Sequence, residues 1–215
     1  ILEATGNVKY SDKIKNVVIT ADKAIYLKNK EKIFTIGNSK AVGDDNTITA
    51  SNLEYDKIKN IFEATGNVKY SDKIKNVVIT ADKAIYLKNK EKIFTIGNSK
   101  AVGDDNTITA SNLEYDKIKN IFEAKINVIA IDFKKDATIF ADEISYKKNE
   151  ETIFTKGKTK ALIKNKYKFN SENVSYFRDT GVLISQRKSS IEDDSGNIYK
   201  LKTFTYDINK EILKG

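Results

Sequence analysis

The chain of 215 residues contains no cysteine, histidine, proline, methionine or tryptophan. Without cysteine it has neither disulfides nor thiolate chemistry, so cysteine usage leaves the cellular compartment open. The absence of histidine removes the commonest general base and the commonest nitrogen ligand for metals. No apolar run is long enough for a transmembrane helix. These absences argue against an enzyme, and we expect no catalytic residue, no metal and no cofactor.

The net charge of +8 comes from 36 lysines and only two arginines, Arg178 and Arg187. Proteins that read nucleic acids generally use arginine forks on base edges and phosphates. We therefore expect no nucleic-acid partner. We interpret the lysine-rich and asparagine-rich composition as the product of an AT-rich coding sequence, with an evolved basic patch as the alternative.

The chain carries a long exact repeat. Residues 3–64 and 63–124 are identical at all 62 aligned positions, which is a period of 60. A finer pattern, I-x-A-x-x-apolar-x-Y, recurs at intervals of 29 to 31 residues. In the last two repeats, Phe169 and Ser171, and then Tyr199 and Leu201, replace the isoleucine and the alanine. The pattern closes on Tyr26, Tyr55, Tyr86, Tyr115, Tyr146, Tyr176 and Tyr206. The period of 60 therefore consists of two repeats of about thirty residues.

Within each repeat, apolar residues two positions apart alternate with polar ones, as in residues 17–21 and 127–132. This is the period of a half-buried strand, and helical periodicity is absent, so the predicted fold class is all-β. The step from Ala21 to the next apolar column at Ala24 is three positions, which predicts a bulge or corner at Asp22-Lys23. Gly-Asn pairs and the segments GDDN and DDSGN predict breaks and turns.

A repeat of about thirty residues cannot bury its apolar face alone, so neighbouring repeats must stack. We predict one continuous domain over residues 1–215, an elongated repeat β-jellyroll of two facing antiparallel sheets with about seven repeats. Its duplicated segments are 3–62 and 63–122, and its divergent segment is 123–215. Either a recent natural duplication or an engineered one explains the identity of the two copies.

The phrases EATGNVKY, VVITADKAIY, TIFADEISY and SSIEDDSGNIYKLKTFTYD resemble the OstA-like family of bacterial lipopolysaccharide transport. That family includes the periplasmic protein LptA and the N-terminal periplasmic domain of LptD. The resemblance covers residues 3–146 well, and the tail from 171 to 215 is more similar to the LptD version. Gly-Asn gives way to Ile126-Asn127 and Gly157-Lys158, which leaves the strand boundaries of the last three repeats open.

The resemblance implies a twisted β-jellyroll whose two sheets form a V-shaped trough, open along one side. It implies lipopolysaccharide or a similar lipid as ligand, with acyl chains in the apolar interior, and end-to-end stacking with itself or with another OstA-like jellyroll. It also implies the periplasm of a Gram-negative bacterium, as a free protein or as part of an outer-membrane protein, peripheral to the membrane. The alternative is a structural β-solenoid with a filled core and no ligand.

The predicted lining of the trough consists of the inward apolar columns. Such columns are ordinary core on general grounds, and the lipid-binding role comes from the resemblance. Lys15, Thr20 and Asp22 should face solvent. The predicted lining residues are Val17, Ile19, Ala21, Ile48, Ala50, Leu53, Val77, Ile79, Ala81, Ile108, Ala110, Leu113, Ile139, Ala141 and Ile144.

Other recurring residues have structural interpretations. Asp22, Asp82 and Asp142 occur at one register position and alternate with serines, as residues at a bulge do. The segment EDDSGN, residues 192–197, lacks the ligand spacing of a calcium loop and predicts a hairpin turn.

The two ends of the predicted stack are unpaired strands. The first segment, residues 1–10, nearly copies the interior segment 61–70, and the last segment ends at Gly215, where a further strand is expected. We therefore predict head-to-tail association by strand addition.

Overall fold

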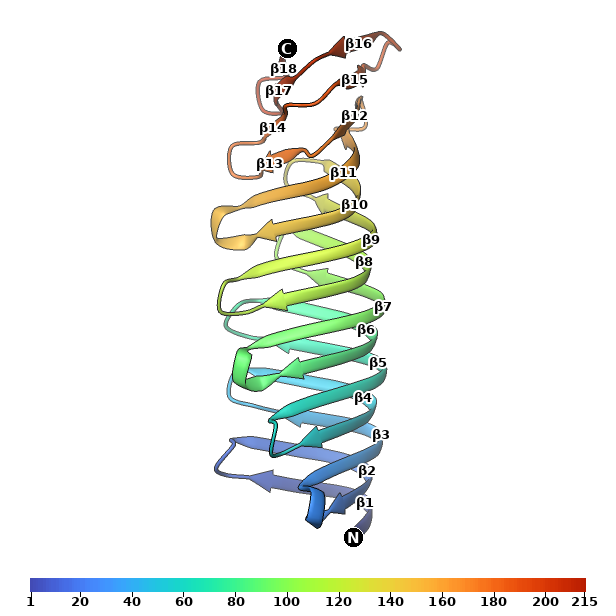
Figure 1. Cartoon of the computed structure of the whole chain (residues 1–215), viewed down its shortest axis with the longest axis vertical. Helices are drawn as coiled ribbons and strands as arrows, with labels where there is room; N and C mark the ends of the chain where they lie inside the picture. Colours follow the sequence, from blue (N-terminus) through green and yellow to red (C-terminus); the bar gives the residue numbers. More distant parts are fainter. The chain divides into compact units, whose positions relative to one another are not determined.

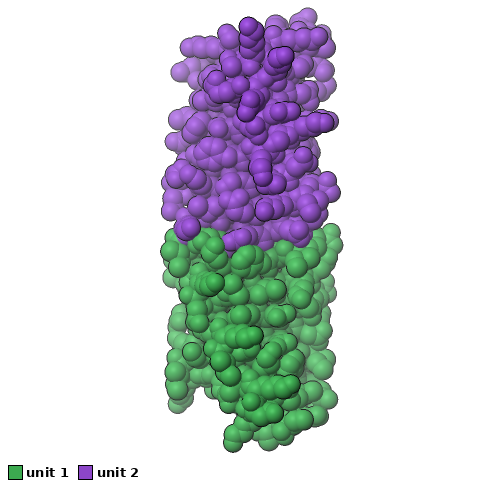
Figure 2. Space-filling view, viewed as in Figure 1, with its two compact units in different colours: residues 1–104, 116–118 green, residues 105–115, 119–215 purple.

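The computed structural model describes residues 1–215 and consists of strands joined by short turns, which confirms the all-β prediction. None of its helical segments is long or apolar enough to cross a lipid bilayer. The chain divides into two compact units (Figure 2). Unit 1 comprises Ile1–Asp104 with Asp116–Ile118, and unit 2 comprises Asp105–Tyr115 with Lys119–Gly215.

In unit 1 each strand pairs antiparallel with the next. Its elements are β1 (Leu2–Asp12), β2 (Val17–Leu27), the 3-10 turn η1 (Lys28–Lys30), β3 (Lys32–Val42), β4 (Asn46–Asp56), β5 (Ile61–Asp72), β6 (Val77–Leu87), η2 (Lys88–Lys90) and β7 (Lys92–Val102).

Unit 2 begins with long strands and continues with shorter ones. Its elements are β8 (Asn106–Asp116, whose last residue belongs to unit 1), β9 (Ile121–Asp132), β10 (Ala137–Lys147), η3 (Lys148–Glu150), β11 (Thr152–Ile163), β12 (Tyr167–Glu172), β13 (Ser175–Phe177), β14 (Val182–Ser185), β15 (Ser189–Glu192), β16 (Ile198–Leu201), β17 (Phe204–Asp207) and β18 (Ile212–Lys214).

Each long strand bends near its middle. The pairing register of β2 with β3 shifts between Thr20 and Lys23, which confirms the predicted bulge. In Figure 1 the bends of unit 1 lie on one side of the ribbon and the turns on the other. The bend divides the strands into an A half-sheet, which in unit 1 holds residues 8–12, 17–21, 39–42, 46–50, 68–72, 77–81 and 99–102, and a B half-sheet, which holds 2–5, 23–27, 32–36, 52–56, 61–65, 83–87 and 92–96.

The Gly-Asn pairs form these bends inside the strands. Gly37 and Asn38 have φ values of 75° and 45°, a region where glycine carries no steric penalty. A Cβ on Gly37 would lie 2.4 Å from Oδ2 of Asp22 on the neighbouring strand. Asn38 Nδ2 donates a hydrogen bond of 2.9 Å to the same oxygen. The predicted structural role of Asp22 is thereby confirmed.

The turns opposite the bends use a different device. In the turn between β1 and β2, Asp12 Oδ1 accepts hydrogen bonds from the N–H groups of Ile14 and Lys15, at 3.1 and 2.9 Å. Asn16 then closes the turn in the left-handed region, which asparagine tolerates well. We call the turns at the outer ends of the A half-sheet the A rim and those of the B half-sheet the B rim.

The divergent segment departs from this pattern. At the bend of β9, Ile126 stands where β5 has Gly66, and it adopts a φ of 69°. After β11 the long strands give way to pairs of short ones, such as β12 and β13, which both pair with β11. The EDDSGN segment joins β15 to its antiparallel partner β16, as the hairpin prediction requires.

Candidate functional site

The space between the two half-sheets is lined by the predicted columns. Fourteen of the fifteen predicted lining residues are buried, and Ala141 is half-buried. On β2, the inward direction of Ile19 and the exposure of Asp22 are confirmed, whereas Thr20, and Lys15 in the turn before β2, were expected to face solvent and are half-buried. The register alternation therefore places one apolar face of each strand inward.

The odd-numbered strands also supply buried apolar residues to the interior, and the predicted lining omitted them. In unit 1 these buried residues include Ile33, Phe62, Ala64, Val68 and Tyr70. Their signal was present in the sequence, because F-E-A and V-K-Y show the same alternation of apolar and polar residues. The interior is thus apolar on both sides.

Aromatic rings fill the part of the interior nearest the rims in unit 1. Tyr55 stacks on Phe62 with ring centroids 4.3 Å apart, and Phe62 lies 6.4 Å from Tyr86. Tyr70 of the A half-sheet lies 5.6 Å from Tyr86 of the B half-sheet, so the two half-sheets touch through these rings. The protein's own side chains therefore occupy the interior.

Unit 2 repeats this packing. Tyr115 stacks on Phe122 at 4.3 Å, and Phe122 lies 6.1 Å from Tyr146. Farther along, Phe169 and Phe204 lie 5.3 Å apart. We call the seven tyrosines that close the repeated sequence pattern the register tyrosines. Six of them are core residues, and Tyr26, in the first repeat, is half-buried.

The tyrosine hydroxyls reach the rims and connect them. Tyr86 OH donates to Glu91 of the B rim at 3.3 Å and accepts from Nδ2 of Asn46, on the A half-sheet, at 3.0 Å. Tyr55 OH donates to Asn60 at 3.1 Å. Burial raises the pKa of Tyr86, and the carboxylate of Glu91 raises it further. The rings of Tyr55 and Tyr86 are therefore each anchored by a polar contact at the outer end.

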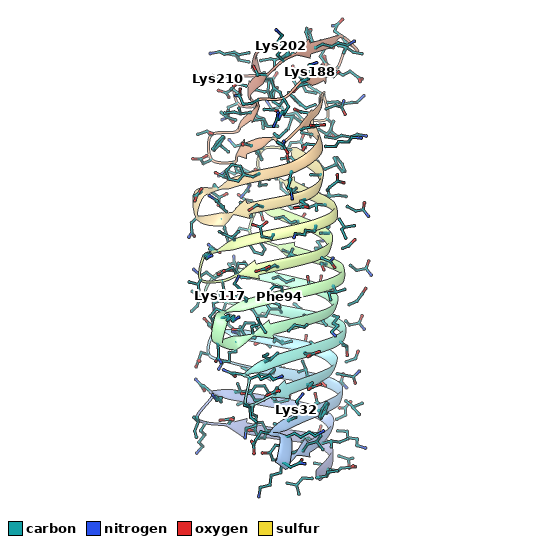
Figure 3. The ribbon with its side chains drawn as sticks, in the orientation of Figure 1. Lys32, Phe94, Lys117, Lys188, Lys202 and Lys210 are labelled. Carbon is teal, nitrogen blue, oxygen red and sulfur yellow. The ribbon has the colours of Figure 1, made fainter.

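A buried lysine bridges the two rims of unit 1. Lys117 of the B rim lies 2.5 Å from Asp45 and 3.2 Å from Asp72, both on the A side, and 3.1 Å from Glu91. Burial acts to lower the pKa of Lys117, but hydrogen bonds to Asp45 and Glu91 outweigh it, and the pKa is raised. Figure 3 shows Lys117 on the side of the ribbon where the strands turn back.

A weaker bridge forms one period earlier. Lys57 of the B rim contacts Glu31 at 2.7 Å but lies 4.0 Å from Asp12 of the A half-sheet. Its ammonium also lies over the rings of Tyr10 and Tyr26, at 5.9 and 5.6 Å. Because Lys57 has one close carboxylate and Lys117 has three, the rim is held less firmly at Lys57.

Unit 2 has an arginine in the corresponding place. Arg178 of the B rim bonds Asp105 at 2.6 Å and Asp132 at 3.0 Å, both on the A side, and also Glu151. Its guanidinium donates to Tyr146 OH at 2.7 Å. Only 5% of Arg178 is exposed. We call Lys57, Lys117 and Arg178 the rim cations. Prediction missed them, although each stands two positions after a register tyrosine.

Residues 18–121 match the sequence profile of the family described as LptA/(LptD N-terminal domain) LPS transport protein. The matched segment, just under half of the chain, is similar to this family. Fourteen chains of known structure also match significantly. One is LptH from Pseudomonas aeruginosa, described as the LptA homologous periplasmic component of the conserved lipopolysaccharide transport device. The match to LptH has 17% identity and a TM-score of 0.50, and it covers 54% of this chain and 87% of LptH.

The likeness to LptH shows a shared fold, and it agrees with the predicted jellyroll. No curated protein matches the sequence significantly. The similarity to the LptA/LptD family thus lies in the repeats of unit 1 and the first strands of unit 2, where the sequence phrases are also clearest.

Proposed function

We propose that the chain is a periplasmic lipid-conduit module, without catalytic activity, that holds acyl chains of lipopolysaccharide between its half-sheets and stacks end to end with similar jellyrolls. The observation that carries the proposal is the repeated inward apolar residues on both half-sheets of each unit, in a chain whose residues 18–121 match the LPS transport family. The single continuous domain over residues 1–215 is part of this proposal.

The interior offers a suitable environment for an alkyl chain. Each methylene moved from water into it gains about 0.8 kcal/mol. The attraction is non-directional and the lining repeats, so an acyl chain can pass from one repeat to the next between similar wells. Near the bend, small inward side chains such as those of Ala21 and Ala81 let a thin ligand approach the backbones of the facing strands.

Loading has a cost that follows from the same geometry. An acyl chain must displace the contact between Tyr70 and Tyr86, which means that the half-sheets separate at the rims. The rim cations resist that separation, since their carboxylates lie on opposite half-sheets. We propose that the rim opens first near Lys57, where the bridge is weakest.

A filled structural core remains the second candidate, because the protein's own side chains pack the interior. The absence of tryptophan allows a direct test. Phe62→Trp places one fluorophore in the interior, and Phe94→Trp places one on the outer face of the B half-sheet, where Figure 3 labels Phe94. Dibromostearate quenches tryptophan only on contact.

A conduit predicts strong quenching of the Phe62→Trp protein, little quenching of the Phe94→Trp protein, and recovery of fluorescence when lipopolysaccharide is added as competitor. Equal quenching at both positions, or none at either, would contradict acyl-chain binding and favour the filled core. Urea unfolding of both variants checks that the interior tryptophan is accommodated.

A further inference from the structure

The rims of unit 1 present four large isoleucines to solvent. Ile14 and Ile74 on the A rim are 94% and 72% exposed, and Ile58 and Ile118 on the B rim are 73% and 71% exposed. Each stands at the tip of a D-K-I-K-N turn, with a lysine on either side. Successive isoleucines on one rim are four strands apart, which is about 19 Å.

The charge exposed at these rims is mainly positive. Two carboxylates are exposed, Asp44 and Asp104, and each accepts a hydrogen bond from a neighbouring asparagine. Other rim carboxylates, such as Asp72 and Glu91, are directed at the rim cations. The exposed lysines of the unit 1 rims are Lys13, Lys28, Lys30, Lys59, Lys73 and Lys90.

We propose that the rims of unit 1 dock on an anionic lipid surface, with the opening between the half-sheets facing the lipid. The isoleucines would enter the boundary between headgroups and acyl chains, while the exposed lysines beside them, Lys13, Lys59 and Lys73, stay at the level of the anionic headgroups. Exposed aliphatic side chains between lysines are the pattern that interfacial binding requires.

Other anionic partners fit the rims less well. The large exposed side chains at these turns are aliphatic, so they offer no stacking surface for nucleic-acid bases. The outer face of the A half-sheet is also basic, with Lys9, Lys40, Lys69 and Lys100 exposed, but its neighbouring side chains are threonines and valines. In unit 1 the rims combine exposed lysines with large exposed aliphatic residues.

The test uses the full chain and co-sedimentation with vesicles of phosphatidylglycerol and phosphatidylcholine, compared with vesicles of phosphatidylcholine alone. The rim variant carries Ile14→Ser and Ile74→Ser. Its control carries Ile36→Ser and Ile96→Ser, which remove two isoleucines from the outer face of the B half-sheet that are 49% and 53% exposed. We expect the rim variant to bind anionic vesicles about tenfold more weakly and the control to bind as the parent does.

A second pair of variants tests whether binding depends on the position of the lysines or only on the net charge of the protein. Lys13→Gln with Lys73→Gln should weaken binding to anionic vesicles several-fold, whereas Lys9→Gln with Lys69→Gln, which changes the net charge equally, should have a much smaller effect. Equal losses in both pairs would overturn the proposal, because binding would then follow net charge alone. Failure of the parent to bind anionic vesicles would also overturn it, and would point to an acidic protein as the partner.

This inference does not depend on acyl-chain binding in the interior. Quenching of Phe62→Trp by dissolved dibromostearate should be unchanged by the rim substitutions. Vesicle binding without interior quenching would therefore refute the conduit and retain the docking surface, and the converse result would do the opposite.

Discussion

Gly66 and Ser51 face each other at the bend of two neighbouring strands, where a Cβ on Gly66 would lie 2.7 Å from Oγ of Ser51. Ile126 occupies the same place 60 residues later and does carry a side chain, at a φ of 69°. A β-branched residue in the left-handed region is strained. The chain therefore contains an unstrained and a strained version of one bend.

We expect Ile126→Gly to raise the free energy of unfolding by about 1 kcal/mol, since relief of strain exceeds the entropic cost of glycine. Gly66→Ile should lower it by more, because it adds both strain and a clash. Urea unfolding curves measure both changes. A destabilised Ile126→Gly protein would show that the half-exposed isoleucine side chain makes a contact worth more than the strain.

The two arginines of the chain provide a matched pair for testing the rim cations. Arg178→Met leaves the buried Asp132 without its cation, so it should lower the free energy of unfolding by about 3 kcal/mol or more. Arg187 is exposed, and Arg187→Met should change the free energy of unfolding by less than about 0.5 kcal/mol. Equal effects of the two substitutions in urea unfolding would show that the Arg178 bridge contributes nothing to the closed rim.

Two buried tyrosines differ in the partner of their hydroxyl. Tyr176 OH donates to Asp132 at 2.8 Å, whereas Tyr206 OH has no partner. Tyr176→Phe should therefore cost about 2 kcal/mol, and Tyr206→Phe should be neutral or stabilise by about 1 kcal/mol. Thermal unfolding of the two variants beside the parent gives the comparison. A loss of stability in Tyr206→Phe would mean that its hydroxyl is satisfied in solution.

The sequence was sufficient to predict the strands, the bulge at Asp22 and the inward direction of Ile19 and Ile79, because all three follow from alternation within a few residues. The rim cations were not predicted. Arg178 and Asp105 are 73 residues apart in sequence, and they meet only because their strands lie on facing half-sheets. Alternation determines which face a side chain takes, but it does not determine which side chain lies opposite.

The ring contacts in the interior were not predicted for the same reason. The columns predicted an apolar interior, yet the contact between Tyr70 and Tyr86 depends on the distance between the half-sheets. That distance is set by the bend and by the size of the rings on both sides, and no local pattern encodes it.

Stability should fall in alkali. Burial raises the pKa of Tyr55, Tyr86, Tyr146 and Tyr176 above the ordinary value. Since the folded-state pKa is the higher one, their contribution is complete below about pH 10 and is lost as the pH rises beyond it, where the unfolded chain ionises first. The urea midpoint should therefore fall steeply above about pH 10. Tyrosinate absorbance that rises fully near pH 10 while the protein stays folded would contradict this account.

Substitutions at Ala4 and Ala64 distinguish the role of the exposed edge strand β1 from that of the buried strand β5. The two alanines lie in identical sequence, E-A-T-G-N-V-K-Y, but Ala64 is 1% exposed between β4 and β6, whereas Ala4 is exposed because β1 pairs only with β2. Ala64→Asp buries an unpaired charge and should lower the free energy of unfolding by about 3 kcal/mol or more. Ala4→Asp should hardly change stability.

If β1 accepts a strand from another jellyroll, as we propose, the same charge at Ala4 should abolish association, since it would become buried at the new interface. Sedimentation velocity over a range of protein concentrations measures this directly. A parent protein that stays monomeric at high concentration, or an Ala4→Asp variant that associates as the parent does, would rule out self-association through this edge.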